Sequence, residues 1–244
     1  MFYLKIADLV IRIENRYDYS EIFCRGFQIY GVKAEDCSLH IAVSDQEIEA
    51  QRQLAVKRGR RIYPAWYYEN IAIQRRLCQE LLRYDALFVH SALLCVDGAG
   101  YALCAGVHGG KSTQAAIWLK LFGSRAVCIN GDKPVYRLSG KTLTGYGTPW
   151  MGKEASGTNQ SVPVKAFFFL KKGTENRAKR LNGPEILSRL FYHLELPADE
   201  NHVREMEQLL ISLLPAVSFF ELECTKSPEA ARIALAASGD LKSR

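Results

Sequence analysis

Residues 105–112 have the types and spacing of a phosphate-binding loop. In order they are Ala105, Gly106, Val107, His108, Gly109, Gly110, Lys111 and Ser112. This order fits the loop pattern, with Ala105 in place of the usual first glycine. Such glycines let backbone N–H groups turn inward toward a phosphate. Lys111 then reaches the β- and γ-phosphates, and the Ser112 hydroxyl ligates Mg²⁺. We therefore predict a nucleotide site from Gly106 to Thr113, taking ATP and Mg²⁺.

The flanks of this loop fit the pattern. Residues 100–105 form an apolar run that predicts a buried strand, and residues 112–119 predict a helix that opens with hydroxyl residues. The alternative is a glycine-rich turn with an incidental lysine. His108 stands where a second glycine is more usual. Either it is a tolerated turn residue with a positive φ, or its ring meets the phosphate or the substrate.

Asp132 follows an apolar stretch, residues 126–130, that predicts a strand. A carboxylate at the end of such a strand is placed to hold Mg²⁺ or to meet the attacking hydroxyl, the alternative being a plain turn carboxylate. Arg137 is predicted on the next strand, within reach of the same site.

Two further side chains are candidates. His90 lies in an apolar run, one short hairpin before the loop, and is either a core histidine or a functional one. Lys153 ends a glycine-rich, aromatic stretch, residues 144–153, that predicts a mobile loop. It is either a phosphate ligand or a solvated side chain.

The surrounding elements follow from hydrophobic periodicity. Short alternating runs in residues 1–56 predict antiparallel strands, and Ser44 with Glu47 predicts a capped helix start. We also expect an amphipathic helix over 64–84, a hairpin around Asp97 and Gly98, strands over 162–170 and 218–223, and helices over 183–193, 198–214 and 227–237. Residues 1–85 thus form a β-rich region with a linker helix, and residues 86–244 the nucleotide-binding domain.

Composition excludes several classes of protein. The 244 residues are 48% hydrophobic and 24% charged, as in ordinary globular proteins, and a net charge of +6 suits an anionic ligand. Basic residues do not alternate with aromatic ones, so we expect no nucleic-acid partner. None of the seven cysteines forms a C-x-x-C pair, and no apolar run reaches membrane-spanning length. We expect a cytoplasmic protein without a signal peptide or a membrane contact.

The ordered set of motifs resembles the kinase domain of HPr kinase/phosphorylase, whose core is related to phosphoenolpyruvate carboxykinase. The matching pieces are His90-Ser91-Ala92, the hairpin, the Gly-Gly-Lys-Ser-Thr loop and the stretch Asn130 to Pro134. Tyr146 to Lys153, Val162 to Lys165 and Asn176-Arg177 look more closely like the small, mostly bacterial HPr-kinase-like proteins. The resemblance covers residues 86 to 225 well and residues 1–85 loosely. It implies an α/β fold with a mixed sheet, a phosphate-loop core and a small β-rich N-terminal region.

The resemblance also implies Mg-ATP-dependent phosphorylation of a serine hydroxyl. In that family two acidic residues end the strand after the loop, and one acts as general base. Only the second is present here, as Asp132, because the first position is Gly131. His90 would lie near the transferred phosphoryl group. The family's second glycine-rich signature is not found. HPr kinases form hexamers, which leaves a homo-oligomer open for this chain.

Our leading hypothesis is an ATP-dependent kinase acting on a hydroxyl of a peptide, protein or small molecule. Asp132 would orient or deprotonate the acceptor, and His90, Lys111, Arg137 and Lys153 would stabilise charge on the transferring group. The rival is a nucleotide-binding sensor or partner protein without turnover, which the missing acidic residue favours. A carboxykinase-type enzyme would need a further metal site of His, Lys and Asp, for which no spacing is evident.

Overall fold

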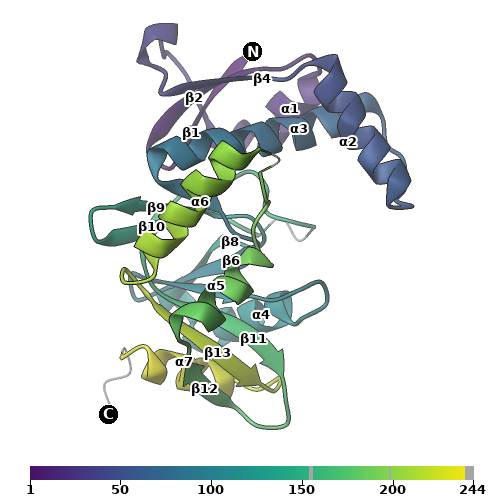
Figure 1. Ribbon diagram of the computed structural model, residues 1–244. Coiled ribbons are helices and arrows are strands. Elements are labelled where there is room, and N and C mark those ends of the chain that lie inside the picture. The colour runs from purple at the N-terminus through teal and green to yellow at the C-terminus, as the bar shows by residue number, and fades with distance from the viewer. Residues whose placement is uncertain (154–155, 198, 240–244) are drawn as a thin grey trace. The chain divides into compact units, whose positions relative to one another are not determined.

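The computed structural model describes residues 1–153, 156–197 and 199–239 and shows helices combined with mixed sheets, an α/β fold. The chain divides into two units, Met1–Tyr84 and Asp85–Arg244, each built around a sheet of its own (Figure 1).

The N-terminal unit holds a four-stranded sheet in the order β3-β1-β2-β4. Its strands are β1 (Phe2–Ile6), β2 (Leu9–Glu14), β3 (Gln28–Ile29) and β4 (Leu39–Ala42). Its helices are α1 (Asp18–Phe23), α2 (Asp45–Lys57) and α3 (Ala65–Glu80), with 3₁₀ turns at Arg25–Phe27, Ala34–Asp36 and Leu81–Tyr84. β1 pairs antiparallel with β2 and β3, as predicted.

The prediction of antiparallel pairing is wrong for β4, which runs parallel to β2. The chain leaves β2 by a crossover instead of a hairpin. Glu69 of α3 is fully buried, and its carboxylate accepts the N–H groups of Arg16, at 2.5 Å, and Tyr17, at 3.3 Å, and the hydroxyl of Ser20. These bonds hold the chain after β2 against α3, and the chain returns to the sheet first as β3, beside β1, and then as β4, beside β2.

Both helix starts predicted in this unit are confirmed. Ser44 Oγ accepts the Glu47 N–H at 3.2 Å, and Glu47 Oε2 accepts the Ser44 N–H at 2.8 Å, which is a capping box. Pro64 is the N-cap of α3, whose buried face includes Tyr68, Ile73 and Leu77.

The C-terminal unit has two linked groups of strands. In the central sheet the order is β8-β6-β7-β11-β13-β12, and β5, β9 and β10 form a ribbon that joins the start of β11. The strands are β5 (Ala86–Phe88), β6 (Ser91–Val96), β7 (Ala99–Cys104), β8 (Ala126–Asn130), β9 (Val135–Ser139), β10 (Thr142–Tyr146), β11 (Ser161–Lys172), β12 (Arg177–Arg180) and β13 (Ser218–Cys224). The helices are α4 (Lys111–Phe122), α5 (Gly183–Phe191), α6 (Glu200–Leu213) and α7 (Glu229–Ala237), with a 3₁₀ turn at Gly123–Arg125.

Strand direction brings several chain segments to one edge of the central sheet. β7, β11 and β13 are parallel, and β8 has the same direction as β7 because both are antiparallel to β6. Four strands therefore end at the same edge, where ligands of open α/β sheets commonly bind. The hairpin between β6 and β7 turns at the opposite edge, through Asp97 at φ 50° and Gly98 at φ 80°, as the sequence predicted.

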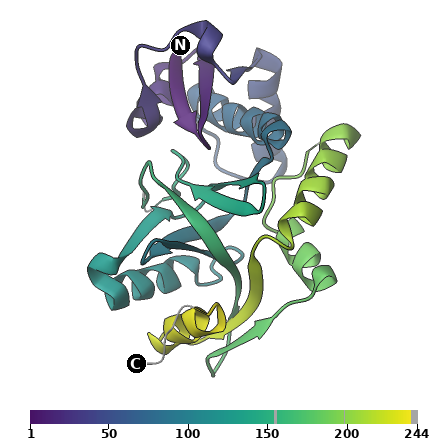
Figure 2. The same cartoon turned by 90° about the vertical axis from the view of Figure 1, so that its left-hand side faces the viewer.

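Helices cover the central sheet on both sides (Figure 2). Trp118 of α4 and Ala231 of α7 pack with Phe168 and Phe220 of the sheet in one buried cluster. On the other face, the Arg189 guanidinium of α5 lies 6.0 Å from the centre of the Phe169 ring. The sheet is thereby fixed against α4, the helix that follows the predicted phosphate loop.

One further prediction differs from the structure, and one strand was not predicted. The loop predicted from Thr144 is wrong for Thr144, Gly145 and Tyr146, which lie in β10. A side-chain carbon at Gly145 would come within 2.4 Å of Leu93, so the glycine lets this strand pack closely. β12 was not predicted, because its residues are mostly charged. The helix predicted over 198–214 is α6, and the predicted first residue, 198, lies outside the described residues. Within the described ranges, none of the helices has the length and apolar character needed to cross a membrane.

Candidate functional site

The glycine-rich loop joins β7 to the N-terminus of α4, as its sequence predicted. The chain reaches α4 through left-handed conformations at His108, φ 59°, and Gly110, φ 100°. A histidine in this region costs more conformational energy than a glycine. His108 therefore takes the positive φ foreseen for a turn residue, and it also lines the adjoining cleft.

The first turn of α4 presents backbone donors to this loop. Gln114 N–H donates to the Gly110 carbonyl at 2.9 Å and is the first N–H of the helix ladder. The N–H groups of Lys111, Ser112 and Thr113 therefore have no acceptor within the helix. Together with the partial positive charge of a helix N-terminus, they suit an anion.

Asp132 is the meeting point of two cationic or protonatable side chains. His90 Nε2 lies 3.1 Å from Asp132 Oδ1, and Lys111 Nζ lies 3.2 Å from the same oxygen. His90 precedes β6, Lys111 opens α4 and Asp132 follows β8, so the sheet edge brings the three together. Lys111 is only 9% exposed.

Burial and charge set the protonation of this group. Burial alone would raise the pKa of the Asp132 carboxyl, but the hydrogen bond from His90 and the charge of Lys111 outweigh it and lower the pKa. Burial also lowers the pKa of Lys111, an effect that the nearby Asp132 opposes. The carboxylate is thus held in its charged form at neutral pH.

A buried amide fixes the position of Asp132. Asn130 Oδ1 accepts the N–H groups of Asp132, at 2.9 Å, and Lys133, at 2.8 Å. Its Nδ2 donates to the carbonyl and the hydroxyl of Thr148, and that hydroxyl donates to the Lys133 carbonyl at 2.7 Å. Asn130 and Thr148 are both fully buried, so all of these bonds are shielded from water.

The residue before Asp132 packs against the following segment. Gly131 N–H donates to the Ser156 carbonyl at 2.8 Å. A side-chain carbon at position 131 would lie 3.2 Å from the carbonyl oxygens of both Met151 and Ser156. An acidic side chain at this position would therefore point at two acceptors, and Asp132 is the carboxylate that the site retains.

His193 is a second histidine at the site. Its backbone carbonyl accepts the His90 N–H at 2.8 Å, and the two rings lie 6.0 Å apart. Burial, with smaller contributions from His90 and Lys111, lowers the pKa of His193 to about 4. His193 is buried, at 7% exposure, and it was not among the predicted site residues.

A cleft of about 830 Å³ runs along this edge of the sheet. Its lining includes most of the predicted site residues: His90, Gly106, Val107, His108, Gly109, Gly110, Lys111, Ser112, Thr113, Asp132 and Lys153. Arg137 lies on β9 and is not among the described residues that line it. The sequence missed the lining residues Gln114, Lys172, Gly173, Thr225 and Lys226. One sequence feature could have indicated them. Lysine and small residues stand at the end of the apolar strand β11 and directly after the apolar strand β13.

The donor set can be tested for Mg²⁺. Ser112 and Asp132 both line the cleft, whereas the described residues contain no group of three or more His, Cys, Asp or Glu side chains that would hold a metal by themselves. Mg²⁺ is commonly bound by one or two protein oxygens together with substrate phosphates. The residues present fit that mode.

Comparisons with known proteins give a distant likeness among solved structures. No protein-family model matches the chain, and no curated protein matches its sequence. Among solved structures, an HPr(Ser) kinase/phosphatase from Coxiella burnetii is similar with a TM-score of 0.37 and 10% sequence identity. The match covers 64% of this chain and 97% of that one. This is a weak likeness at the level of the fold.

Proposed function

We propose that this protein is an ATP- and Mg²⁺-dependent kinase that transfers the γ-phosphoryl group to the hydroxyl of a peptide, protein or small molecule. One observation carries the proposal: His90 and Lys111 converge on Asp132 Oδ1 in a cleft walled by the glycine-rich loop.

The charge of the cleft supports a polyphosphate ligand. Its described lining holds four lysines, Lys111, Lys153, Lys172 and Lys226, against a single carboxylate, Asp132. The loop and the first N–H groups of α4 would hold the phosphates, and Lys111 would exchange its contact with Asp132 for the β- and γ-phosphates. Ser112 and Asp132 would hold Mg²⁺, which supplies charge neutralisation.

The lowered pKa of Asp132 bears on its role. A carboxylate with a low pKa is a weak base, but it orients a hydroxyl well through a charge-assisted hydrogen bond. Phosphoryl transfer through a loose transition state needs positioning more than early deprotonation. We therefore assign Asp132 to orienting the acceptor hydroxyl and receiving its proton late, with His90 steadying the carboxylate. Lys153, at the same cleft, would neutralise charge on the transferring group.

A nucleotide-binding protein without turnover is the second candidate. It is favoured by Gly131, whose packing against Met151 and Ser156 leaves the cleft lining with one carboxylate.

Release of ADP distinguishes the two functions. Mg-ATP is incubated with the full chain alone, with free serine and with serine-containing peptides. A kinase gives ADP release that Asp132→Asn reduces by about 10²-fold or more. Asp97→Asn is the matched control, because Asp97 lies in the hairpin turn at the opposite sheet edge, paired with Arg125. ADP release that is equal in wild type and Asp132→Asn would refute the role of Asp132, and binding without ADP release would favour the second candidate.

A further inference from the structure

The cleft continues past the glycine-rich loop to the carboxyl ends of β11 and β13. β8, which leads to Asp132, is two strands from β7 on one side, and β13, which leads to Thr225, is two strands away on the other. At about 4.8 Å per strand, each end lies roughly 10 Å from the loop. If Asp132 marks the reactive end, the unreactive part of a bound nucleotide extends toward Thr225.

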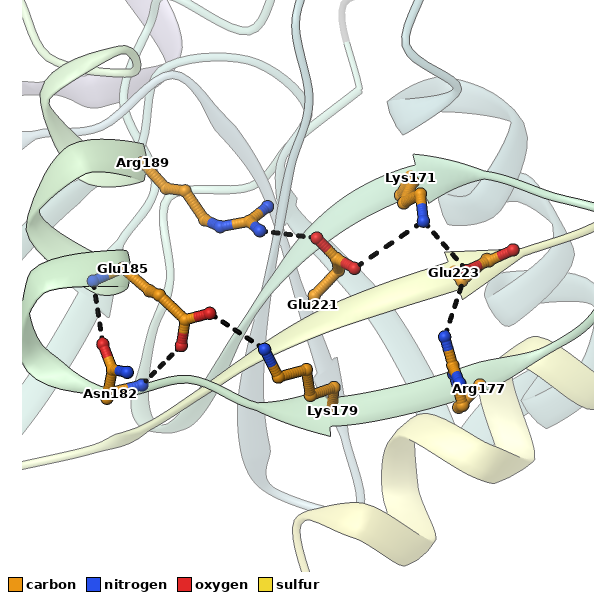
Figure 3. A network of polar contacts seen from close by, with 8 residues as sticks. All are labelled: Lys171, Arg177, Lys179, Asn182, Glu185, Arg189, Glu221 and Glu223. Atoms are coloured by element: carbon orange, nitrogen blue, oxygen red, sulfur yellow. Dashed lines mark hydrogen bonds and ion pairs between the residues drawn. The ribbon is translucent and has the colours of Figure 1, made fainter.

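The two lysines at this end are available to a ligand. Among the described residues neither Lys172 nor Lys226 forms an ion pair, and both are exposed. Lys171, by contrast, pairs with Glu221 and Glu223 on the other face of the sheet (Figure 3). Because successive strand residues face opposite sides, Lys172 projects to the α4 side, where the loop lies.

A network of ion pairs holds β11, which ends at Lys172, and β13, which leads to Lys226. Glu223 contacts Lys171 of β11 at 3.1 Å and Arg177 of β12 at 3.6 Å, and Glu221 contacts Arg189 of α5 at 2.5 Å (Figure 3). β11, β12, β13 and α5 are therefore tied together beside the cleft. The ends of β11 and β13 are fixed points on which a ligand can be positioned.

The turn after β13 is ordered by a second set of bonds. Asn176 Oδ1 accepts the Thr225 N–H at 2.8 Å and its hydroxyl at 3.1 Å, and Asn176 Nδ2 donates to Ser227 Oγ. Gln114 of α4 donates through Nε2 to the Thr225 carbonyl at 2.7 Å. The turn is thereby joined to the helix that opens with Lys111.

The amide oxygen of Gln114 is a hydrogen-bond acceptor without a donor in the described structure. The side chain is 3% exposed and lines the cleft, yet its Oε1 has no hydrogen-bond partner among the residues that the structure describes. A buried acceptor without a donor costs about 1–3 kcal/mol. A hydroxyl or an amine on a ligand would supply that donor.

We propose that this end of the cleft binds the nucleoside half of a nucleoside triphosphate. Lys172 and Lys226 pair with its α-phosphate, and Gln114 Oε1 accepts from a ribose hydroxyl or a base amine. The inference rests on the proposed function, because it uses Asp132 to define the reactive end. It adds that affinity for the nucleotide comes from both sides of the glycine-rich loop.

The test compares ATP with inorganic tripolyphosphate, which has the phosphates and lacks the nucleoside. Both are titrated with Mg²⁺ into the full chain by calorimetry. Wild type should bind ATP at least about tenfold more tightly than tripolyphosphate, as one or two hydrogen bonds to the nucleoside would give. The variants are Gln114→Met and the double variant Lys172→Ala with Lys226→Ala. Lys120→Ala, an exposed position of α4 outside the cleft lining, controls for loss of positive charge.

Gln114→Met should weaken ATP about tenfold and leave tripolyphosphate within about threefold, so that the preference for ATP collapses. The double lysine variant should weaken both ligands about tenfold, because both ligands carry a phosphate at the α position. The inference is overturned if wild type binds both ligands equally, if Gln114→Met weakens both equally, or if the double lysine variant weakens neither. Each of these results leaves the phosphate site of the proposed function standing. Failure of wild type to bind either ligand would overturn both.

Discussion

The His90 ring lies 3.1 Å from Oδ1 of Asp132, although β6, β7, the glycine-rich loop, α4 and β8 separate the two residues in the chain. The contact exists because β6 begins at the sheet edge where β8 ends. Lys111 Nζ lies 3.2 Å from the same oxygen, so a single carboxylate oxygen contacts both side chains.

His90 should act by holding this carboxylate in place. We expect His90→Ala to lower the rate of ADP release by about 10- to 100-fold, the value of a charge-assisted hydrogen bond. His90→Gln retains a donor and should recover part of that loss. The KM for ATP should change little in either variant. Equal rates for His90→Ala and wild type would show that the contact has no part in turnover.

Asn130 should be critical for stability. Asn130→Asp keeps the acceptor for the N–H groups of Asp132 and Lys133 but turns a buried carboxylate toward the Thr148 carbonyl. We expect a loss of about 2–4 kcal/mol in the free energy of unfolding, measured with urea. Lys141→Ala, an exposed substitution between β9 and β10, should stay within about 0.5 kcal/mol of wild type. A similar value for both variants would contradict the role of Asn130.

Replacement of Gly131 by an acidic residue should destabilise the protein. A side-chain carbon there lies 3.2 Å from the Met151 and Ser156 carbonyl oxygens, which repel a carboxylate. Gly131→Asp should therefore destabilise the fold by about 1–3 kcal/mol, and Gly131→Ala by less. Thermal unfolding measures both. An Asp variant at least as stable as wild type would show that an acidic residue at the first position of this pair could be accommodated here.

His193 should make stability depend on pH. Its pKa is lowered by burial to about 4 from an ordinary value of 6.5. Between these values the unfolded chain binds a proton that the folded protein does not, so stability falls as pH decreases from 6.5 toward 4, by up to about 1 kcal/mol per pH unit. His193→Gln should flatten this dependence between pH 6.5 and 5, before most carboxylates titrate. Parallel curves for the two proteins would contradict the assignment.

Elements with local signals were predictable from the sequence. The Ser44–Glu47 capping box, Pro64 before α3 and the Asp97-Gly98 turn each act within a few residues, and each is present in the structure. The loop before Lys111 also has its expected strand and helix flanks.

Features that depend on long-range pairing were not predictable. The positions of Lys172 and Thr225 beside the loop follow from β11 and β13 aligning parallel to β7, which no local pattern specifies. The parallel pairing of β4 with β2 likewise joins segments that α1 and β3 separate in the chain. His193 lies beside His90 only because the chain after α5 meets the start of β6, where the His193 carbonyl accepts the His90 N–H.

The most direct test of the phosphate site is calorimetric titration of Mg-ATP into wild type and Lys111→Met. Methionine keeps the buried stem of the side chain and removes its charge, so the fold should persist, which circular dichroism checks. Binding to wild type that weakens at least about tenfold in Lys111→Met, and stays unchanged in Lys120→Ala, is the result we predict. Equal affinity of wild type and Lys111→Met, or no binding to wild type, would contradict a nucleotide-phosphate site at this loop.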